Sequence, residues 1–180
     1  MMSQPLAERL RPKTLDDYIG QKHLVGPGAV LRKMIDAGRV PSFILWGPPG
    51  VGKTTLAQII SNKLEAPFYT LSAISSGVKD VREVIEKAKG NRFFNTVSPI
   101  LFIDEIHTII GAGSASGGTL DASNLLKPAL SSGQLKCIGA TTFTEFRNVF
   151  EKDHALARRF QKIDINEPTV EQTVQILRGL

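Results

Sequence analysis

The residues with the clearest chemistry lie between Gly47 and Thr54, where the sequence GPPGVGKT fits the pattern G-x-x-x-x-G-K-[ST]. In this pattern a glycine-rich backbone turns its N–H groups toward a phosphate, and a Cβ at the glycines would crowd the anion. Lys53 would reach the β and γ phosphates of a nucleoside triphosphate, and the Thr54 hydroxyl would ligate Mg²⁺. The alternative is a glycine-rich turn that only joins a strand to a helix. The complete pattern instead predicts a phosphate-binding loop of Gly47, Pro48, Pro49, Gly50, Val51, Gly52, Lys53, Thr54 and Thr55.

Two adjacent acids, Asp104 and Glu105, follow the continuous apolar run 100–103. Such a run is typical of a central parallel strand, and side chains at its carboxyl end emerge where α/β sheets bind ligands. There Asp104 would hold Mg²⁺, directly or through water, and Glu105 would polarise an attacking water as general base. Two acids alone usually mark a solvated turn, but their place about fifty residues after the loop favours the catalytic interpretation. His107 is either a nucleotide sensor or a packed structural residue.

Hydroxyl and guanidinium groups form a third set. The apolar run 138–140 ends in Thr141 and Thr142, whose hydroxyls are suited to hold a water near the γ-phosphate. Arg158 and Arg159 precede the last strand candidate of the chain. An arginine pair is usually a surface feature, but an arginine supplied by a neighbouring subunit can stabilise the transition-state charge of phosphoryl transfer. That role requires the arginines to face away from their own phosphate site, and it implies a ring or filament with heterologous contacts.

Short apolar runs alternate with amphipathic helical patterns along the chain. The strand candidates are 42–46, 67–71, 99–103, 135–140 and 160–165. The helix candidates are 29–37, 53–64, 78–89, 121–132 and a last helix opened by the capping box 169–172. Residues 6–13 are interpreted as a polar lead-in. Strands that alternate with helices predict an α/β fold with a doubly wound, mostly parallel sheet.

Length and composition fit a single domain spanning residues 1–180. The hydrophobic share is 42% and the charged share 22%, and no apolar run approaches the roughly 20 residues of a membrane helix. The first residues lack the apolar core of a signal peptide, and Cys137 is the single cysteine, so no internal disulfide can form. We therefore expect a cytoplasmic protein with no membrane partner. Its net charge of +5 is compatible with nucleic acid without requiring it.

Together these motifs resemble the large ATPase domain of AAA+ proteins over nearly the whole chain, and two groups of relatives share the resemblance. The first part, to about residue 100, resembles RarA (MgsA), the replication-associated recombination ATPase, in LAERLRPKTLDDYIGQKHLVGPG, SFILWGPPGVGKTTLA and LSAISSGVKDVREVIEKAK. The last part resembles the first ATPase ring of ClpA-type Clp unfoldases in HTIIGAGSASGGTLDASNLLKPALSSG, IGATTFTEFRNVFEKDHALARRFQKIDI and EPTVEQTVQIL. We therefore expect a natural or engineered chimera, with a lead-in and helices at 1–41, a RarA-like half at 42–106 and a ClpA-like half at 107–180.

The resemblance implies a P-loop NTPase fold, the AAA+ large subdomain, with a five-stranded parallel sheet flanked by helices. It also implies ATP and Mg²⁺ as ligands, ATP hydrolysis, and a homo-oligomer built through arginine-finger contacts. The strand order of the family would place the strand at 135–140 between the strands at 42–46 and 99–103. Both ladders of that strand would then cross the boundary between the two halves.

Matching positions imply individual roles. Thr142 matches the sensor 1 residue of the family, and Arg158 with Arg159 match the finger arginines of the Clp rings. The residues that would contact the adenine are Tyr18, Ile19 and Gly20.

The chain also departs from both groups of relatives. Clp rings grip polypeptide through an aromatic-glycine pore loop, and the interval between the two nucleotide motifs contains no such sequence. Residues 111–121 resemble the secondary Clp pore loop, but their glycines and serines offer little grip. No lid subdomain is expected within the 180 residues, so we expect weak ATP affinity and slow ATPase turnover in isolation. A structural, nucleotide-binding protein that does not hydrolyse ATP is the alternative, and DNA and polypeptide both stay open as substrates.

Overall fold

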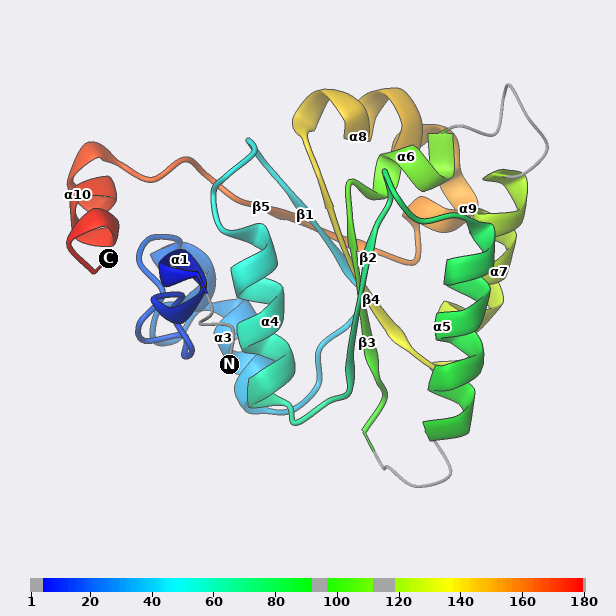
Figure 1. Ribbon diagram of the computed structural model, residues 1–180, viewed down its shortest axis with the longest axis horizontal. Helices are drawn as coiled ribbons and strands as arrows, with labels where there is room; N and C mark the ends of the chain where they lie inside the picture. Colours follow the sequence, from blue (N-terminus) through cyan, green and yellow to red (C-terminus); the bar gives the residue numbers. More distant parts are fainter. Residues whose placement is uncertain (1–4, 92–96, 112–118, 180) are drawn as a thin grey trace.

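The computed structural model describes residues 5–91, 97–111 and 119–179. Within these residues, five parallel strands form one sheet with helices on both faces (Figure 1). The strands are β1 (Phe43–Trp46), β2 (Phe68–Ser72), β3 (Ile100–Asp104), β4 (Lys136–Thr141) and β5 (Gln161–Asp164). Each strand begins and ends within one residue of the segment predicted to form it. The α/β fold expected from the sequence is confirmed.

The longer helices also match the amphipathic patterns. They are α3 (Val30–Asp36), α4 (Lys53–Lys63), α5 (Val78–Asn91), α7 (Thr119–Ser131) and α10 (Val170–Gly179). The sequence does not predict the shorter helices α1 (Leu6–Arg9), α2 (Lys22–Val25), α6 (Ile106–Gly111), α8 (Phe143–Val149) and α9 (His154–Ala157), or the 3-10 turn η2 at Phe150–Lys152. Such segments contain too little of a helical period to be recognised. The polar lead-in expected at residues 6–13 contains α1.

The strand order in the sheet is β2-β3-β4-β1-β5. β4 lies between β1 and β3, as the family's strand order implies, with Ala140 beside Leu45 and Ile138 beside Phe102. In addition, the Cys137 N–H donates to Ser42 Oγ at 3.0 Å. Residues from before and after position 106 are therefore joined in one continuous sheet.

The core has one cluster on each face of the sheet, because successive strand residues point to opposite sides. Phe43 and Leu45 of β1 pack with α3 and α4, whereas Ile44 and Trp46 pack with α5 and α7. Figure 1 shows these helix pairs on opposite sides of the strands. All four β1 residues are buried, so the chain leaving β1 starts from a rigid base.

The last helix, α10, has no buried residue. It begins with the predicted capping box: the Thr169 N–H donates to Gln172 Oε1 at 3.0 Å, and the Gln172 N–H donates to Thr169 Oγ1 at 3.2 Å. The glycine- and serine-rich stretch 112–118 lies outside the described residues. Among the described helices, none has the length and apolar character needed to cross a membrane.

Candidate functional site

The loop after β1 leads directly into α4, as the order of strand, glycine loop and helix predicts. Gly52 caps α4 with a φ of +89°, and Gly50 has a φ of +76°, a backbone conformation that glycine adopts most readily. Gly47 is required for another reason, since a Cβ there would lie 2.3 Å from the carbonyl oxygen of Ile165. The Gly47 N–H also donates to the Thr141 carbonyl oxygen at 3.1 Å. The loop is therefore held tightly between the ends of β4 and β5.

Lys53 opens α4, and its ammonium lies back over the loop. Its Nζ donates to the carbonyl oxygens of Gly47 and Pro48 at 2.9 and 2.7 Å. Burial lowers the pKa of Lys53, and the negative charges of Asp104 and Glu105 oppose that shift. A phosphate would add negative charge beside the same ammonium. Lys53 can therefore exchange its carbonyl partners for phosphate oxygens.

The two acids stand at the carboxyl end of the sheet. Asp104 is the last residue of β3, and Glu105 follows it with a φ of +51°. Left-handed backbone is uncommon for residues other than glycine, and it concentrates at functional sites. The Glu105 N–H donates to Asp104 Oδ1 at 3.2 Å, and both side chains are exposed. Two carboxylates are thus presented to solvent beside the phosphate-binding loop.

The hydroxyls at the end of β4 have separate partners. Thr142 Oγ1 accepts a hydrogen bond from the Glu145 N–H at 3.4 Å and so caps α8. Thr141 is buried, and its Oγ1 lies 2.9 Å from Nδ1 of His107 in α6. His107 thereby ties the segment after the two acids to the end of β4.

These groups line one hollow of about 290 Å³, the phosphate pocket, at the carboxyl edge of the sheet. Three segments far apart in the sequence meet there with one arginine from the N-terminal region. The lining residues are Arg11, Pro49, Gly50, Gly52, Lys53, Thr54, Thr55, Asp104, Glu105, His107, Ala140, Thr141 and Thr142. The structure thus brings together all the predicted catalytic and metal-binding residues except the two arginines. Gly47 and Pro48 are not in the lining and contact the site through the carbonyl oxygens that accept from Lys53.

The donor set of the phosphate pocket suits Mg²⁺. Thr54 offers a hydroxyl and Asp104 a carboxylate, and hard oxygen ligands of this kind are those that Mg²⁺ prefers. Across the described residues, no three His, Cys, Asp or Glu side chains gather into a metal site. Mg²⁺ typically binds through one or two carboxylates together with substrate phosphates and water. The residues present therefore fit a Mg²⁺ ion shared with a bound triphosphate.

A second hollow of about 560 Å³ adjoins the phosphate pocket. The two share the residues Arg11, Gly50, Gly52 and Thr55. Arg9, Arg11 and Lys13 bring positive charge to its wall, a contribution that sequence reasoning missed.

Of the three residues predicted to contact adenine, two line this second pocket and one does not. Tyr18 and Ile19 line it together with Val51, whereas Gly20 does not. The Tyr18 hydroxyl donates to the Gly52 carbonyl oxygen at 3.2 Å, and burial raises the pKa of Tyr18 to about 12. Gly20 has a φ of +89° and lies against Gln172 of α10. Gly20 therefore turns the chain, whereas Tyr18 and Ile19 supply surface to the second pocket.

Arg158 and Arg159 lie outside both pockets, at the end of α9. Arg158 Nε donates to the His154 carbonyl oxygen at 3.3 Å. Arg159 Nε donates to Ser131 Oγ at 2.8 Å, and its Nη1 donates to the Ala155 carbonyl oxygen. Both side chains are exposed. The arginines are thus held in place on the surface and do not line the phosphate pocket of their own chain.

Asp153 anchors the short helix that carries these arginines. Its Oδ1 accepts from the Leu156 N–H at 3.0 Å, and its Oδ2 accepts from Ser123 Oγ at 2.7 Å and pairs with Lys127 Nζ at 3.0 Å. Burial by itself would raise the pKa of Asp153, but the bonds from Ser123, Lys127 and the Leu156 N–H outweigh it, so the pKa is lowered. The ionised carboxylate therefore fastens α9 to α7.

Comparisons with known proteins agree with this geometry. The family model described as "ATPase family associated with various cellular activities (AAA)" matches residues 43–166. A ClpA homolog protein of Fuscovulum blasticum is 48% identical over 151 residues, which cover 76% of this chain and 19% of that protein. Replication-associated recombination protein A of Haemophilus influenzae is 39% identical over 174 residues, which cover 97% of this chain and 36% of that protein. Both groups that the sequence resembles are therefore found among its relatives.

A solved structure shares the fold along most of the chain. A variant of RuvB from Thermotoga maritima matches with a TM-score of 0.69 and 26% identity, over 94% of this chain and 53% of that one. The chain spans well under half the length of the two relatives named above.

Proposed function

Because the chain belongs to the ATPase family associated with various cellular activities (AAA), we propose that it binds ATP together with Mg²⁺ and hydrolyses the ATP. The observation that carries this proposal is the phosphate pocket, where Lys53 and Thr54 share one lining with Asp104, Glu105 and Thr142. If the glycine loop were only a connecting turn and the two acids only a solvated pair, nothing would require their side chains to line the same hollow.

ATP would lie across the two adjoining pockets. Its triphosphate would follow the glycine loop to the N-terminus of α4, whose 11 residues contribute a partial positive charge there. Its base would lie in the second pocket against Tyr18 and Ile19. Bound Mg²⁺, held by Thr54 and Asp104 with phosphate oxygens, would neutralise charge that develops on the phosphates.

Hydrolysis requires a base and an oriented water. Glu105 would take a proton from the water as the water oxygen bonds to the γ-phosphorus and the bond to the bridging oxygen breaks, releasing ADP and phosphate. Lys53 would stabilise charge on the γ-phosphate oxygens. The Thr142 hydroxyl accepts the Glu145 N–H, so its own proton stays available to orient the water or the γ-phosphate.

Full activity would need a neighbouring copy of the chain. Arg158 and Arg159 are exposed and lie outside the phosphate pocket of their own chain, so they would act in the pocket of the next subunit. An arginine supplied in this way accelerates phosphoryl transfer roughly 10³- to 10⁵-fold. The isolated chain would therefore hydrolyse ATP slowly, and a ring would form through heterologous contacts.

The chimera proposal has consequences for the same site. It is supported by the similarity to both a ClpA homolog and a recombination protein A. If the halves meet near residue 106, the pairings β1–β4, β1–β5 and β3–β4 all join residues from both halves. The position of Thr142 would then depend on a non-native interface. A chain with this residue misplaced would bind ATP without hydrolysing it, which is the second candidate function.

ATPase assays at rising protein concentration test the proposal. Turnover per chain should rise with protein concentration. Glu105→Gln should remove turnover, and Arg159→Ala should remove its rise with concentration. The matched controls Glu83→Gln and Arg147→Ala change exposed residues outside both pockets and should behave as wild type. Turnover that persists in Glu105→Gln would exclude Glu105 as the base. No turnover at any concentration, with ATP still bound, would select the non-hydrolysing alternative.

Thermal melting with and without Mg-ATP tests binding separately. Ligand at about 100 times its Kd stabilises the native state by about 2.7 kcal/mol, or roughly 5–10 °C for a domain of this size. Lys53→Ala should abolish the shift, and Lys63→Ala, an exposed lysine of the same helix, should retain it. An unchanged shift in Lys53→Ala would refute the assignment of the site.

A further inference from the structure

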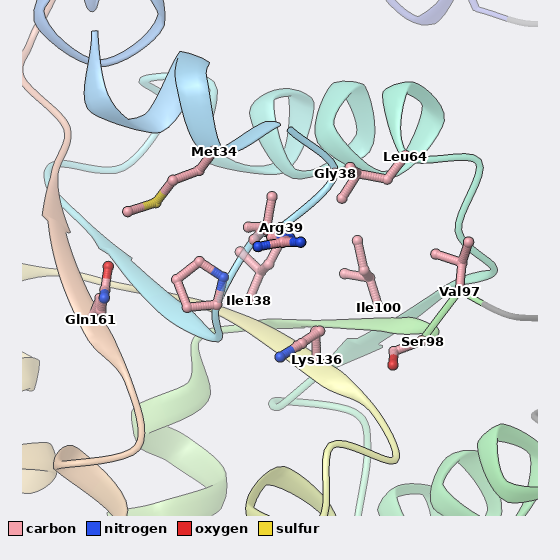
Figure 2. Close-up of a pocket in the computed structure, with 12 residues that line it drawn as sticks. Met34, Gly38, Arg39, Leu64, Val97, Ser98, Ile100, Lys136, Ile138 and Gln161 are labelled. Atoms are coloured by element: carbon pink, nitrogen blue, oxygen red, sulfur yellow. The ribbon is translucent and has the colours of Figure 1, made fainter. Parts of the chain in front are cut away.

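A separate hollow of about 570 Å³, the amino-edge pocket, opens where the strands of the sheet begin (Figure 2). Ile100 opens β3 and Lys136 opens β4, and both line it. Asp104 and Thr141, at the other ends of the same two strands, line the phosphate pocket. At about 3.3 Å per strand residue, the two pockets are roughly 15 Å apart. The amino-edge pocket is therefore no part of the proposed nucleotide site.

The lining of the amino-edge pocket is apolar with two positive charges. Its apolar side chains come from α3, the segments before β1 and β3, the residue after α4, and the strands β3 and β4: Met34, Val40, Pro41, Leu64, Val97, Ile100 and Ile138. Arg39 and Lys136 are its charged residues, and no Asp or Glu lines it. Figure 2 shows both cationic side chains among the apolar ones. Arg39 is exposed and Lys136 is half-buried, and two cations beside an apolar surface favour an occupant that carries negative charge.

Neither cation is neutralised within the described part of the chain. The ion pairs found there involve other residues, and neither the Arg39 nor the Lys136 side chain makes a hydrogen bond to any residue that the structure describes. Lys136 is half-buried beside Ile138. Both groups are therefore available to a ligand.

Backbone groups contribute little to recognition at this edge. The N–H groups that begin the strands are already bonded: that of Ile100 to the Pro67 carbonyl oxygen at 2.8 Å and that of Lys136 to the Pro99 carbonyl oxygen at 2.9 Å. The Ser98 hydroxyl donates to a carbonyl oxygen as well. Charge recognition at this pocket consequently rests on the two cationic side chains.

We propose that the amino-edge pocket binds a small amphipathic carboxylate, with its apolar body on Ile100 and Ile138 and its carboxylate paired with Arg39 and Lys136. The volume lies within the range of roughly 300–1,000 Å³ typical of small-molecule sites. Burial of the apolar body supplies affinity, and the charge-assisted bonds select a carboxylate over an alcohol or an amine.

Octanoate is the probe that tests this site, with octanol and octylamine as ligands of the same chain length. Titration calorimetry on the full chain should give saturable octanoate binding and no octylamine binding. Amide NMR shifts should concentrate at Arg39, Ile100 and Ile138. Shifts at Lys53 instead would place octanoate in the phosphate pocket and overturn the proposal, whatever the outcome of the ATP experiments.

A double variant that removes both positive charges tests whether Arg39 and Lys136 bind the carboxylate. Arg39→Gln combined with Lys136→Gln should weaken octanoate binding roughly tenfold to hundredfold, the effect of losing hydrogen bonds to a charged group, and leave octanol binding unchanged. The control combines Lys33→Gln with Lys63→Gln, two exposed lysines of α3 and α4 that do not line the pocket. An equal loss in the control, or no saturable octanoate binding to the native chain, would refute the proposal.

Discussion

Replacing Gly47 by alanine tests how tightly the phosphate-binding loop is packed against the sheet. The φ of Gly47 lies outside the left-handed region, so the substitution adds no dihedral strain. The added Cβ would instead lie 2.3 Å from the carbonyl oxygen of Ile165 and 3.2 Å from its Cβ. Real Cβ atoms essentially never make contacts under 3.0 Å. The main chain at Ile165 must therefore move by about 0.7 Å or more.

The cost of that movement follows from what holds Ile165 in place. Its N–H donates to the Trp46 carbonyl oxygen at 2.8 Å, and its side chain is completely buried. Weakening one such hydrogen bond costs about 1 kcal/mol, and overpacking a well-packed core costs about 1–3 kcal/mol. Gly47→Ala should thus lower the free energy of unfolding by about 2–4 kcal/mol. For a domain of this size, the melting temperature should fall by roughly 5–15 °C.

Gly50→Ala is the matched control in the same loop. Gly50 has a φ of +76°, and an added Cβ would have no heavy atom within 4 Å. This variant adds only the conformational cost of a left-handed alanine, about 1 kcal/mol. Urea unfolding and thermal melting without nucleotide measure both variants. If Gly47→Ala destabilises the protein no more than Gly50→Ala, the loop is not packed against Ile165 as described.

Two further predictions concern the supports of the site. Asp153→Asn keeps the helix cap but loses the charge that pairs with Lys127, so it should destabilise the protein by about 0.5–1 kcal/mol at neutral pH. Since the pKa of Asp153 is lowered below its ordinary 3.8, this stabilisation is complete above about pH 4–5 and is lost as pH falls through the folded pKa. Melting curves of variant and wild type should therefore converge in acid, and a gap that stays constant to pH 2 would contradict the ionised role. Tyr18→Phe removes the hydroxyl that donates to the Gly52 carbonyl oxygen and should cost about 1 kcal/mol in urea unfolding; an unchanged midpoint would show that this hydrogen bond does not support the loop.

Much of the fold and part of the site could be predicted from the sequence, because the relevant signals act over a few residues. Apolar runs located the buried strands β1, β3 and β4, since a strand buried on both faces needs consecutive apolar residues. The strands β2 and β5 lie at the two edges of the sheet and are less buried. The phosphate-binding loop and Asp104 with Glu105 were found because a parallel strand must present the residues after it at the carboxyl edge of the sheet. The capping box between Thr169 and Gln172 is equally local.

Other features depended on which segments become neighbours, and only the tertiary structure could decide them. Gly47 fits the loop pattern, but the atom its missing Cβ would strike belongs to Ile165, far along the chain. The hydrogen bond between His107 and Thr141 exists because β3 and β4 are adjacent. The positive wall at Arg9, Arg11 and Lys13 and the amino-edge pocket likewise form only when distant segments pack together. Local sequence sets the conformation of each segment, but the burial of apolar faces determines which side chains meet.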